Sequence, residues 1–276
     1  MNAANAAERP VTRSDIEHDL RANFGLQTGD RIAVHSSMKS LGRVDGGPVA
    51  LIEALLAAIG GPRQGTLLMP CFTQPLDEVD ALRTPCRLGL VPETFRTFPG
   101  VRLSNNHTHR VAAIGRDAER LVACHEGTSP LGRGSPFHEL ARLGGDILHI
   151  GCGLTSCSLI HVAEYIMPLP FNAAQIAYPG YNKAITLVRT DGRREQRPPI
   201  DNPGDSAAFG LVQEKLEGYG LIRHGQVGQA ACMRVRGLDI LATSMDLLAG
   251  DPAALLCRNP RCPVCVPKRR IAEGHV

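Results

Sequence analysis

Residues 31–70 read RIAVHSSMKSLGRVDGGPVALIEALLAAIGGPRQGTLLMP, and this stretch decides the fold. It opens with a short apolar run over 31–35, which is typical of a buried strand and ends in a polar turn. The apolar segment 49–59 is long enough for a helix and lies between two turns that contain glycine and proline. A second apolar run follows at 66–69. Strand, helix and strand in this order predict one βαβ unit with parallel strands and a right-handed crossover.

The rest of the chain repeats this alternation of apolar runs and helical patterns, which predicts an α/β fold. Further strands are predicted over 111–115 and 146–150, a hairpin over 184–189 and 193–197, and helices over 14–24, 118–124, 159–166, 207–218 and 239–248. We expect a single domain over 1–276 whose central sheet, mostly parallel or mixed, is flanked by helices. Residues 75–100 predict an irregular surface excursion, residues 1–11 a flexible N-terminus, and residues 257–276 an irregular tail that contains cysteines.

Composition limits the kinds of partner that the chain can have. The 276 residues carry a formal net charge of +3 without a long basic run, so nothing favours nucleic acid. No apolar window approaches the roughly 18 residues of a membrane span, and the N-terminus lacks the apolar core of a signal peptide. We therefore expect a cytoplasmic protein. Its nine cysteines are then expected to be thiols rather than disulfides.

Three predicted strands end in polar or glycine-rich turns, at 35–37, 70–73 and 151–153. In open α/β sheets, ligands bind at the carboxyl ends of the strands, so these turns are the first candidates for a site. The turn formed by His35, Ser36 and Ser37 offers hydroxyl and backbone N–H groups that could hold a phosphate. The alternative is an ordinary strand exit in which the serines satisfy local backbone groups.

His161 and Glu164 stand three residues apart on a predicted helix, which puts both side chains on one face. A carboxylate beside an imidazole fixes the tautomer of the ring and suits it to act as a general base. The alternative is a surface ion pair of the kind that is common on helices. The apolar neighbours of His161 favour the functional interpretation.

Two cysteine patterns have alternative interpretations. Cys152 follows a strand on a tight turn, where it is either a nucleophile served by His161 and Glu164 or a small buried thiol. Cysteines 257, 262 and 265 have the spacing of a zinc knuckle, and Cys232 or His224 could supply a fourth ligand. We favour reduced thiols in a loose tail, and therefore no metal.

A second metal hypothesis concerns residues 105–109. His107 and His109 alternate, so on a strand they would share a face. Two imidazoles without a third ligand nearby are weak support for a metal site.

Several motifs occur in the order found in one known family. They are Val34-His35-Ser36-Ser37-Met38, Val44-Asp45-Gly46-Gly47, Gly65-Thr66-Leu67-Leu68-Met69-Pro70-Cys71-Phe72-Thr73, Ser129-Pro130-Leu131-Gly132, His161-Val162-Ala163-Glu164 and Asp251-Pro252-Ala253. Together they resemble the aminoglycoside 3-N-acetyltransferase family. Arg110 departs from the pattern because the family usually has a serine there, and Cys157 stands where the family has an asparagine.

The resemblance implies acetyl-CoA as the donor and an amine of an aminoglycoside as the acceptor. It assigns His161 as the general base, Glu164 as the carboxylate that orients it, and His35 as a group beside the thioester. Contacts to the cofactor are expected from Ser36, Ser37, Met38, Thr73, Thr108 and His109. Asp201 and Asp205 are candidates for binding a cationic acceptor.

Alternatives to this function remain open in the sequence. The same chemistry could act on a different amino sugar or on a biosynthetic amine. Cys152 and His161 could instead serve a hydrolase or a ping-pong acyltransferase. A third class is a binding protein with a zinc-containing tail. The expected partner is a small amino-sugar molecule, with neither nucleic acid nor membrane, and an oligomer is compatible with the sequence.

Overall fold

A seven-stranded mixed sheet forms the centre of the computed structural model, which describes residues 9–74, 76–174, 183–199 and 205–274. The strands follow the order β4-β5-β2-β1-β6-β10-β9. Their bounds are β1 (Arg31–Ser36), β2 (Thr66–Pro70), β4 (Arg102–Leu103), β5 (Val111–Gly115), β6 (Asp146–Ile150), β9 (Ile222–Val227) and β10 (Ala230–Arg236). The central strands β2, β1 and β6 are parallel, and the other pairs are antiparallel. The predicted βαβ unit is confirmed, although the parallel part is limited to this centre.

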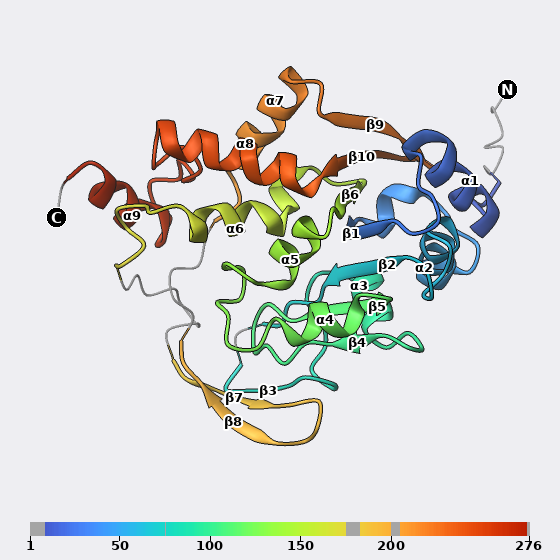
Figure 1. Ribbon diagram of the computed structural model, residues 1–276, viewed down its shortest axis with the longest axis horizontal. Helices are drawn as coiled ribbons and strands as arrows, with labels where there is room; N and C mark the ends of the chain where they lie inside the picture. Colours follow the sequence, from blue (N-terminus) through green and yellow to red (C-terminus); the bar gives the residue numbers. More distant parts are fainter. Residues whose placement is uncertain (1–8, 75, 175–182, 200–204, 275–276) are drawn as a thin grey trace, which may run out of the picture.

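Both faces of the sheet are covered by helices, because the central strands are apolar on both sides. In β1, Ile32 and Val34 belong to one hydrophobic core, and Ala33 between them belongs to the other. The first core is completed by α1 (Arg13–Phe24), α2 (Gly47–Ala58) and α3 (Leu90–Arg96). The second is completed by α4 (Ala118–Ala123), α5 (Pro136–Arg142), α6 (Ser158–Ile166), α7 (Gly210–Gly218) and α8 (Gly237–Gly250). Figure 1 shows α6 and α8 on one side of the strands and α1 and α2 on the other.

Register brings the carboxyl ends of the central strands to one edge. His35 of β1 lies opposite His149 of β6, and Ser36 lies opposite Ile150. Short helical turns follow β1 and β6 directly, η1 (Met38–Leu41) and η2 (Leu154–Ser156). The chain therefore leaves both strands through compact polar turns at the place where a ligand would bind.

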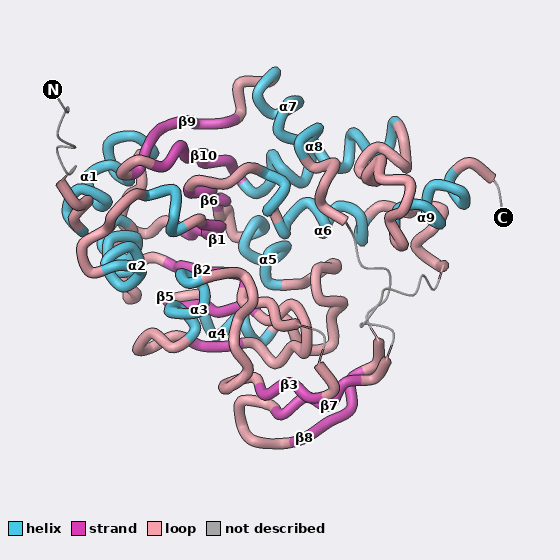
Figure 2. The backbone as a smooth tube through the Cα atoms, turned by 180° about the vertical axis from the view of Figure 1, so that it is seen from behind, coloured by secondary structure: helices cyan, strands magenta, loops and turns pink. Residues whose placement is uncertain are grey.

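A second, three-stranded sheet lies apart from the first, at the bottom of Figure 1 and again in the rear view of Figure 2. It consists of β3 (Glu78–Asp80), β7 (Ile185–Val188) and β8 (Arg194–Arg197), with a small apolar cluster of its own. The predicted hairpin is therefore confirmed. The prediction that 75–100 is irregular is wrong in part, because β3 and α3 lie within it.

The two ends of the chain are more ordered than the sequence suggested. Val11 pairs with Val44 in an isolated bridge, while residues 1–8 lie outside the described part of the chain. The prediction of an irregular tail is wrong for its second half, where α9 (Cys265–Ala272) buries Cys265 and Lys268. None of the described helices combines the length and the apolar character needed to cross a membrane.

Candidate active site

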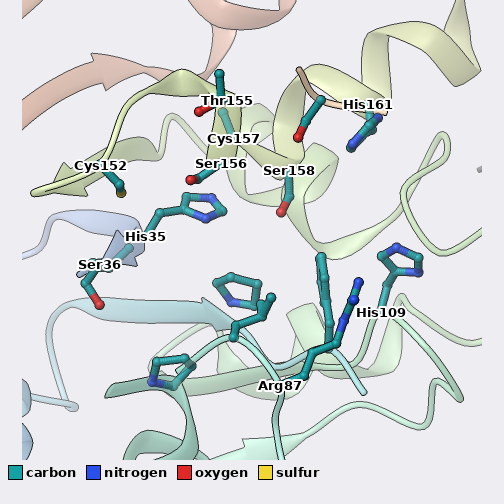
Figure 3. Close-up of a pocket in the computed structure, with 16 residues that line it drawn as sticks. His35, Ser36, Arg87, His109, Cys152, Thr155, Ser156, Cys157, Ser158 and His161 are labelled. Carbon is teal, nitrogen blue, oxygen red and sulfur yellow. The ribbon is translucent and has the colours of Figure 1, made fainter. Parts of the chain in front are cut away.

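A cavity of about 320 Å³ opens at the carboxyl ends of β1, β2 and β6. Its walls come from the exits of these strands, from the loop that carries Arg87, from the turn before α6 and from the first turns of α6 itself. Figure 3 shows Ser36 and Cys152 at one side of this cavity, with His161 and His109 at the other. The site therefore lies where the strand order predicts a ligand.

His161 and Glu164 form the clearest chemical pair in the cavity. The His161 Nδ1 atom lies 2.6 Å from the Glu164 Oε2 atom, and the two side chains are only 15% and 9% exposed. The edge of the His161 ring meets Phe209, with 4.7 Å between the ring centroids. The carboxylate accepts the Nδ1 proton, so Nε2 is the nitrogen that is free to take a proton from a bound group. The contact is the one that the spacing in the sequence predicts.

His35 ends β1 in a stack of rings. Its centroid lies 5.0 Å from that of His149 and 5.9 Å from that of Phe137. Burial lowers the pKa of His35 to about 4, so the ring is neutral near pH 7. Its Nε2 atom is buried and has no hydrogen-bond partner among the described residues. A buried polar atom of this kind is costly unless a ligand or water satisfies it.

His109 faces the cavity as a second neutral imidazole. Burial, followed by the nearby His161, lowers the pKa of His109 to about 3. Its Nδ1 atom lies 3.0 Å from the Thr108 hydroxyl, and Phe72 packs against its ring edge-to-face at 4.5 Å. The ring is thus fixed in orientation and carries no charge that would compete with a cationic substrate.

Only Ser36 and His109 of the predicted cofactor contacts line the cavity. The Ser37 hydroxyl accepts a hydrogen bond from Ser40, and Met38 packs against the core beneath α1 and α2. Thr73 donates to the backbone carbonyl of His107, and Thr108 is buried behind His109. Ser37, Met38, Thr73 and Thr108 do not line the cavity, and their contacts to the cofactor stay predictions.

The two predicted acidic residues do not meet at the cavity. Asp201 lies outside the described residues. Asp205 does not line the cavity and lies instead beside the cysteines near the C-terminus. Its role in acceptor binding stays a prediction, since the structure contains no acceptor. Among the described residues, His107 and His109 join no set of three potential metal ligands.

The predicted set of Cys152, His161 and Glu164 does not assemble. The imidazole nitrogen nearest to the Cys152 sulfur is Nδ1 of His149, at 3.7 Å, and not a nitrogen of His161. Burial raises the pKa of Cys152 to about 11, so the thiol is protonated near neutral pH. A protonated thiol without a base is a poor nucleophile.

Sequence reasoning missed several residues of the cavity wall, above all Arg87, Ser158 and Ser206. Arg87 belongs to the segment that was expected to be an irregular excursion, but its backbone N–H bonds to the carbonyl of Phe72 and brings it to the cavity. Ser158 begins α6, whose N-terminus has no side-chain cap. A cation and a helix N-terminus on one wall suit the negative groups of a ligand.

Arg110, the residue that departs from the family pattern, is fully buried and structural. Its guanidinium donates to the carbonyls of Ala81 at 2.6 Å and Thr84 at 2.7 Å. These bonds tie the loop that follows β3 to the start of β5. Because this loop leads to Arg87, Arg110 supports one wall of the cavity. Arg110 itself contributes no group to the cavity.

Comparison with known proteins finds relatives over most of the chain. The family model of aminoglycoside 3-N-acetyltransferase matches residues 33–249. The chain is 32% identical over 253 residues to aminoglycoside N(3)-acetyltransferase IV from Salmonella sp., covering 86% of this chain and 92% of the relative. It is 34% identical over 264 residues to aminoglycoside N(3)-acetyltransferase IX from Micromonospora chalcea, covering 83% of this chain and 90% of the relative.

A solved structure extends the agreement from the sequence to the fold. The apoenzyme of aminoglycoside acetyltransferase AAC(3)-IVa matches with a TM-score of 0.80 and 29% identity, over 98% of this chain and all of that one (100%). The shared fold, the match of the family model over most of the chain and the ordered motifs lead to one conclusion. The chain belongs to the aminoglycoside 3-N-acetyltransferase family.

Proposed function

We propose that this enzyme transfers the acetyl group of acetyl-CoA to the 3-amino group of an aminoglycoside, with His161 as the general base. The observation that carries the proposal is the 2.6 Å contact between Nδ1 of His161 and Glu164 at the wall of a cavity. Two related structures support the pair of ligands. AAC-IIIb, 25% identical with a TM-score of 0.74, was solved with CoASH. A histidine-to-alanine mutant of AAC(3)-IVa, 28% identical with a TM-score of 0.81, was solved with a gentamicin.

The reaction requires a base because an alkylammonium has no lone pair with which to attack. In the proposed step, Nε2 of His161 takes one proton from the bound ammonium, and the amine nitrogen that results attacks the thioester carbonyl. The negative charge of Glu164 stabilises the imidazolium that forms. The carbon–sulfur bond then breaks, and the departing thiolate takes up the second proton, which the attacking nitrogen loses, so that amide and CoA thiol are the products. The imidazolium of His161 releases its proton to solvent. No covalent enzyme intermediate forms.

His35 fits the role of a group beside the thioester oxygen. Its Nε2 is buried, unpartnered within the described chain and close to the exit of β1. As a neutral ring it can donate one hydrogen bond to the oxyanion of the tetrahedral intermediate without carrying a charge into the resting site. We assign the binding of the negative groups of CoA to Ser36, Arg87 and the first turn of α6, which share the cavity.

The acceptor is a polycation, so acidic groups are expected at its end of the cavity. We keep Asp201 as a candidate for this role, and we do not place Asp205 there because it does not line the cavity. The alternative acceptor, another amino sugar or a biosynthetic amine, would use the same base and the same donor. The two acceptor classes therefore differ only in which amine supports turnover.

A coupled assay tests the proposal directly. Purified protein is incubated with acetyl-CoA and a panel of aminoglycosides that includes gentamicin and apramycin, and free CoA thiol is followed together with the mass of each acceptor. We expect one acetyl group per acceptor, placed on the 3-amino nitrogen by NMR. Thiol release only with a different amine would select the alternative acceptor. Hydrolysis of acetyl-CoA at the same rate without any amine would contradict N-acetyl transfer.

A further inference from the structure

We infer that Asp205, Cys257, Cys262 and Cys265 bind a structural zinc ion that fastens the C-terminal segment to the chain leading into α7. One potential ligand atom from each of the four residues lies within 4.8 Å of all the others. The three cysteines are buried, Asp205 is partly buried, and all the cysteines are free thiols. The inference concerns a metal and does not depend on the proposed function.

One edge of the cluster has the length expected for a tetrahedral ion, and the other ligand atoms lie within 4.8 Å of one another. With Zn–S bonds of about 2.3 Å and a Zn–O bond of about 2.0 Å, the edges of the tetrahedron are about 3.8 Å between sulfurs and about 3.5 Å between sulfur and oxygen. The Cys262 sulfur lies 3.6 Å from the Asp205 Oδ2 atom. A thiol is a weak hydrogen-bond donor, so this contact alone offsets little of the desolvation free energy of a partly buried carboxylate. A shared cation explains why the groups converge.

The backbone around Cys262 and Cys265 is already folded as a ligand turn. The N–H of Cys265 points to the Cys262 sulfur at 3.4 Å, and the N–H of Cys262 bonds to the carbonyl of Asn259 at 3.1 Å. Arg269 donates to the carbonyls of Leu256 and Cys257, at 3.0 and 3.1 Å, and so holds the third cysteine in place. Such bonds from outside the ligand set fix the ligands in orientation.

Nearby charge suits an anionic metal centre. Three thiolates and a carboxylate around Zn²⁺ leave a net charge of −2, which needs a cation near it when the site is buried. Lys268 is only 2% exposed and lies one turn after Cys265, with its ammonium 5.3 Å from the centroid of the Phe171 ring. The ammonium lies within electrostatic range of Glu164 as well as of Cys262 and Cys265, so the carboxylate and the thiols share this cation.

The proposed ligand set differs from the sequence prediction in two ways. The fourth ligand is Asp205 rather than Cys232 or His224. The Cys232 thiol, on β10, donates to the carbonyl of Ala230, and His224 is exposed on β9 beside Glu217. The preference for a metal-free tail came from the prediction that 257–276 is loose, whereas Cys257, Cys262 and Cys265 belong to the hydrophobic core that also contains residues of α6 and α7.

The site has a structural consequence for the cavity. Ser206, next to Asp205, lines the cavity, and Phe209 packs against the ring of His161. Figure 1 shows α9 close to the end of α6, the helix that carries His161. A metal bound to Asp205 would therefore stabilise the segment that forms this wall of the cavity. The metal takes part in no step of the proposed reaction.

Metal analysis of the whole chain, purified without an affinity tag that binds metal, tests the inference. We expect about one zinc per chain, with cobalt substitution giving the thiolate charge-transfer band and the intense visible bands of a tetrahedral site. Cys262→Ser and Asp205→Asn should lose most of the bound zinc. Cys232→Ser and His224→Ala, the matched controls from the alternative ligand set, should keep it. A chelator should lower the Tm of the wild-type protein and leave that of Cys262→Ser unchanged.

Three outcomes would overturn the inference. The first is folded wild-type protein with its thiols reduced and less than about a tenth of a zinc per chain, even after incubation with zinc. The second is zinc content that falls in the control variants but not in Cys262→Ser. The third is Asp205→Asn with unchanged zinc content and an unchanged cobalt spectrum, which removes Asp205 from the ligand set. If Cys262→Ser does not fold, the chelator experiment on the wild-type protein decides.

Discussion

His161 and Glu164 show how much of a site can depend on one hydrogen bond. The carboxylate holds Nδ1 at 2.6 Å and so determines which nitrogen of the ring can act as a base. Glu164 is itself 7% exposed, and the carbonyl of the same residue accepts a bond from Asn172 at 3.1 Å. Glu164 is therefore fixed by its backbone as well as by its side chain, and it leaves Nε2 of His161 as the nitrogen available for the proposed proton transfer.

Glu164→Gln tests the role of the carboxylate as a positioning residue. The amide keeps the shape of the side chain but removes the negative charge that stabilises the imidazolium. We expect kcat to fall by about 10² or more, with the KM for acetyl-CoA changed by less than about threefold. Steady-state kinetics measures both. A parallel rise in KM with kcat intact would show that Glu164 serves binding instead.

Cys152→Ser separates direct transfer from a ping-pong mechanism. Because burial raises the pKa of this thiol to about 11 and His149 is its nearest imidazole, we expect kcat to stay within about tenfold of the wild-type value. Intact-mass analysis after mixing with acetyl-CoA should show no acetylated protein. A stable acetyl adduct on Cys152 of the wild-type enzyme would support the ping-pong route.

At the scale of elements, the sequence predicts those parts that have strong apolar runs between clear turns. The strands β1, β2, β5 and β6 and the helices α2, α6 and α8 lie where the patterns place them, within a few residues. The strand β9 was missed because its residues, apart from Val227, are exposed or partly buried at the edge of the sheet and form no apolar run. The strand β10 was missed because Arg234 and Arg236 interrupt its apolar residues. The helix α9 was missed because its buried face consists of a cysteine and a lysine instead of large apolar side chains.

Arg110 gives a prediction about the element that carries Arg87. In Arg110→Met, the carbonyls of Ala81 and Thr84 lose their donor inside the protein. We expect the free energy of unfolding to fall by about 2–4 kcal/mol, measured by urea denaturation. Arg133→Met, at an exposed position, is the control and should change it by less than about 0.5 kcal/mol. The same free energy of unfolding in both variants would mean that water replaces the hydrogen bonds that Arg110 donates.

At the scale of the whole molecule, buried neutral histidines connect stability to pH. Burial lowers the pKa of His35, His107 and His125 to about 4, that of His109 to about 3, and that of His149 far below its usual value. In the unfolded chain these rings protonate near pH 6.5. Below that pH the unfolded state binds more protons than the folded state, so stability falls as the pH falls.

We therefore expect the free energy of unfolding to be nearly constant from pH 8 to 7 and to decrease from about pH 6.5 to 4. At pH 5 each such histidine contributes a loss of up to about 2 kcal/mol, because 1.5 pH units correspond to about that energy. Urea denaturation at pH 8, 6.5 and 5 measures the effect. Paired carboxylates such as Glu93, whose pKa is lowered, stop contributing to the free energy of unfolding only at lower pH. A free energy of unfolding that stays constant down to pH 5 would therefore contradict the account.

The candidate site was predictable where a motif carries its own geometry, and not where distant segments meet. The spacing of His161 and Glu164 on one helix is enough to predict their contact. The convergence of Asp205 with three cysteines more than fifty residues later depends on how α7 and α9 pack, which no local pattern encodes. The same holds for Arg87, which reaches the cavity through a loop that follows a three-residue strand.

The most direct test of the central claim is the kcat for CoA thiol release by His161→Ala, with an aminoglycoside that the wild-type enzyme acetylates. The account predicts a fall of about 10² to 10⁴, with acetyl-CoA and acceptor binding and thermal stability retained. A kcat within a few-fold of the wild-type value, in a folded variant, would contradict the assignment of His161 as the base.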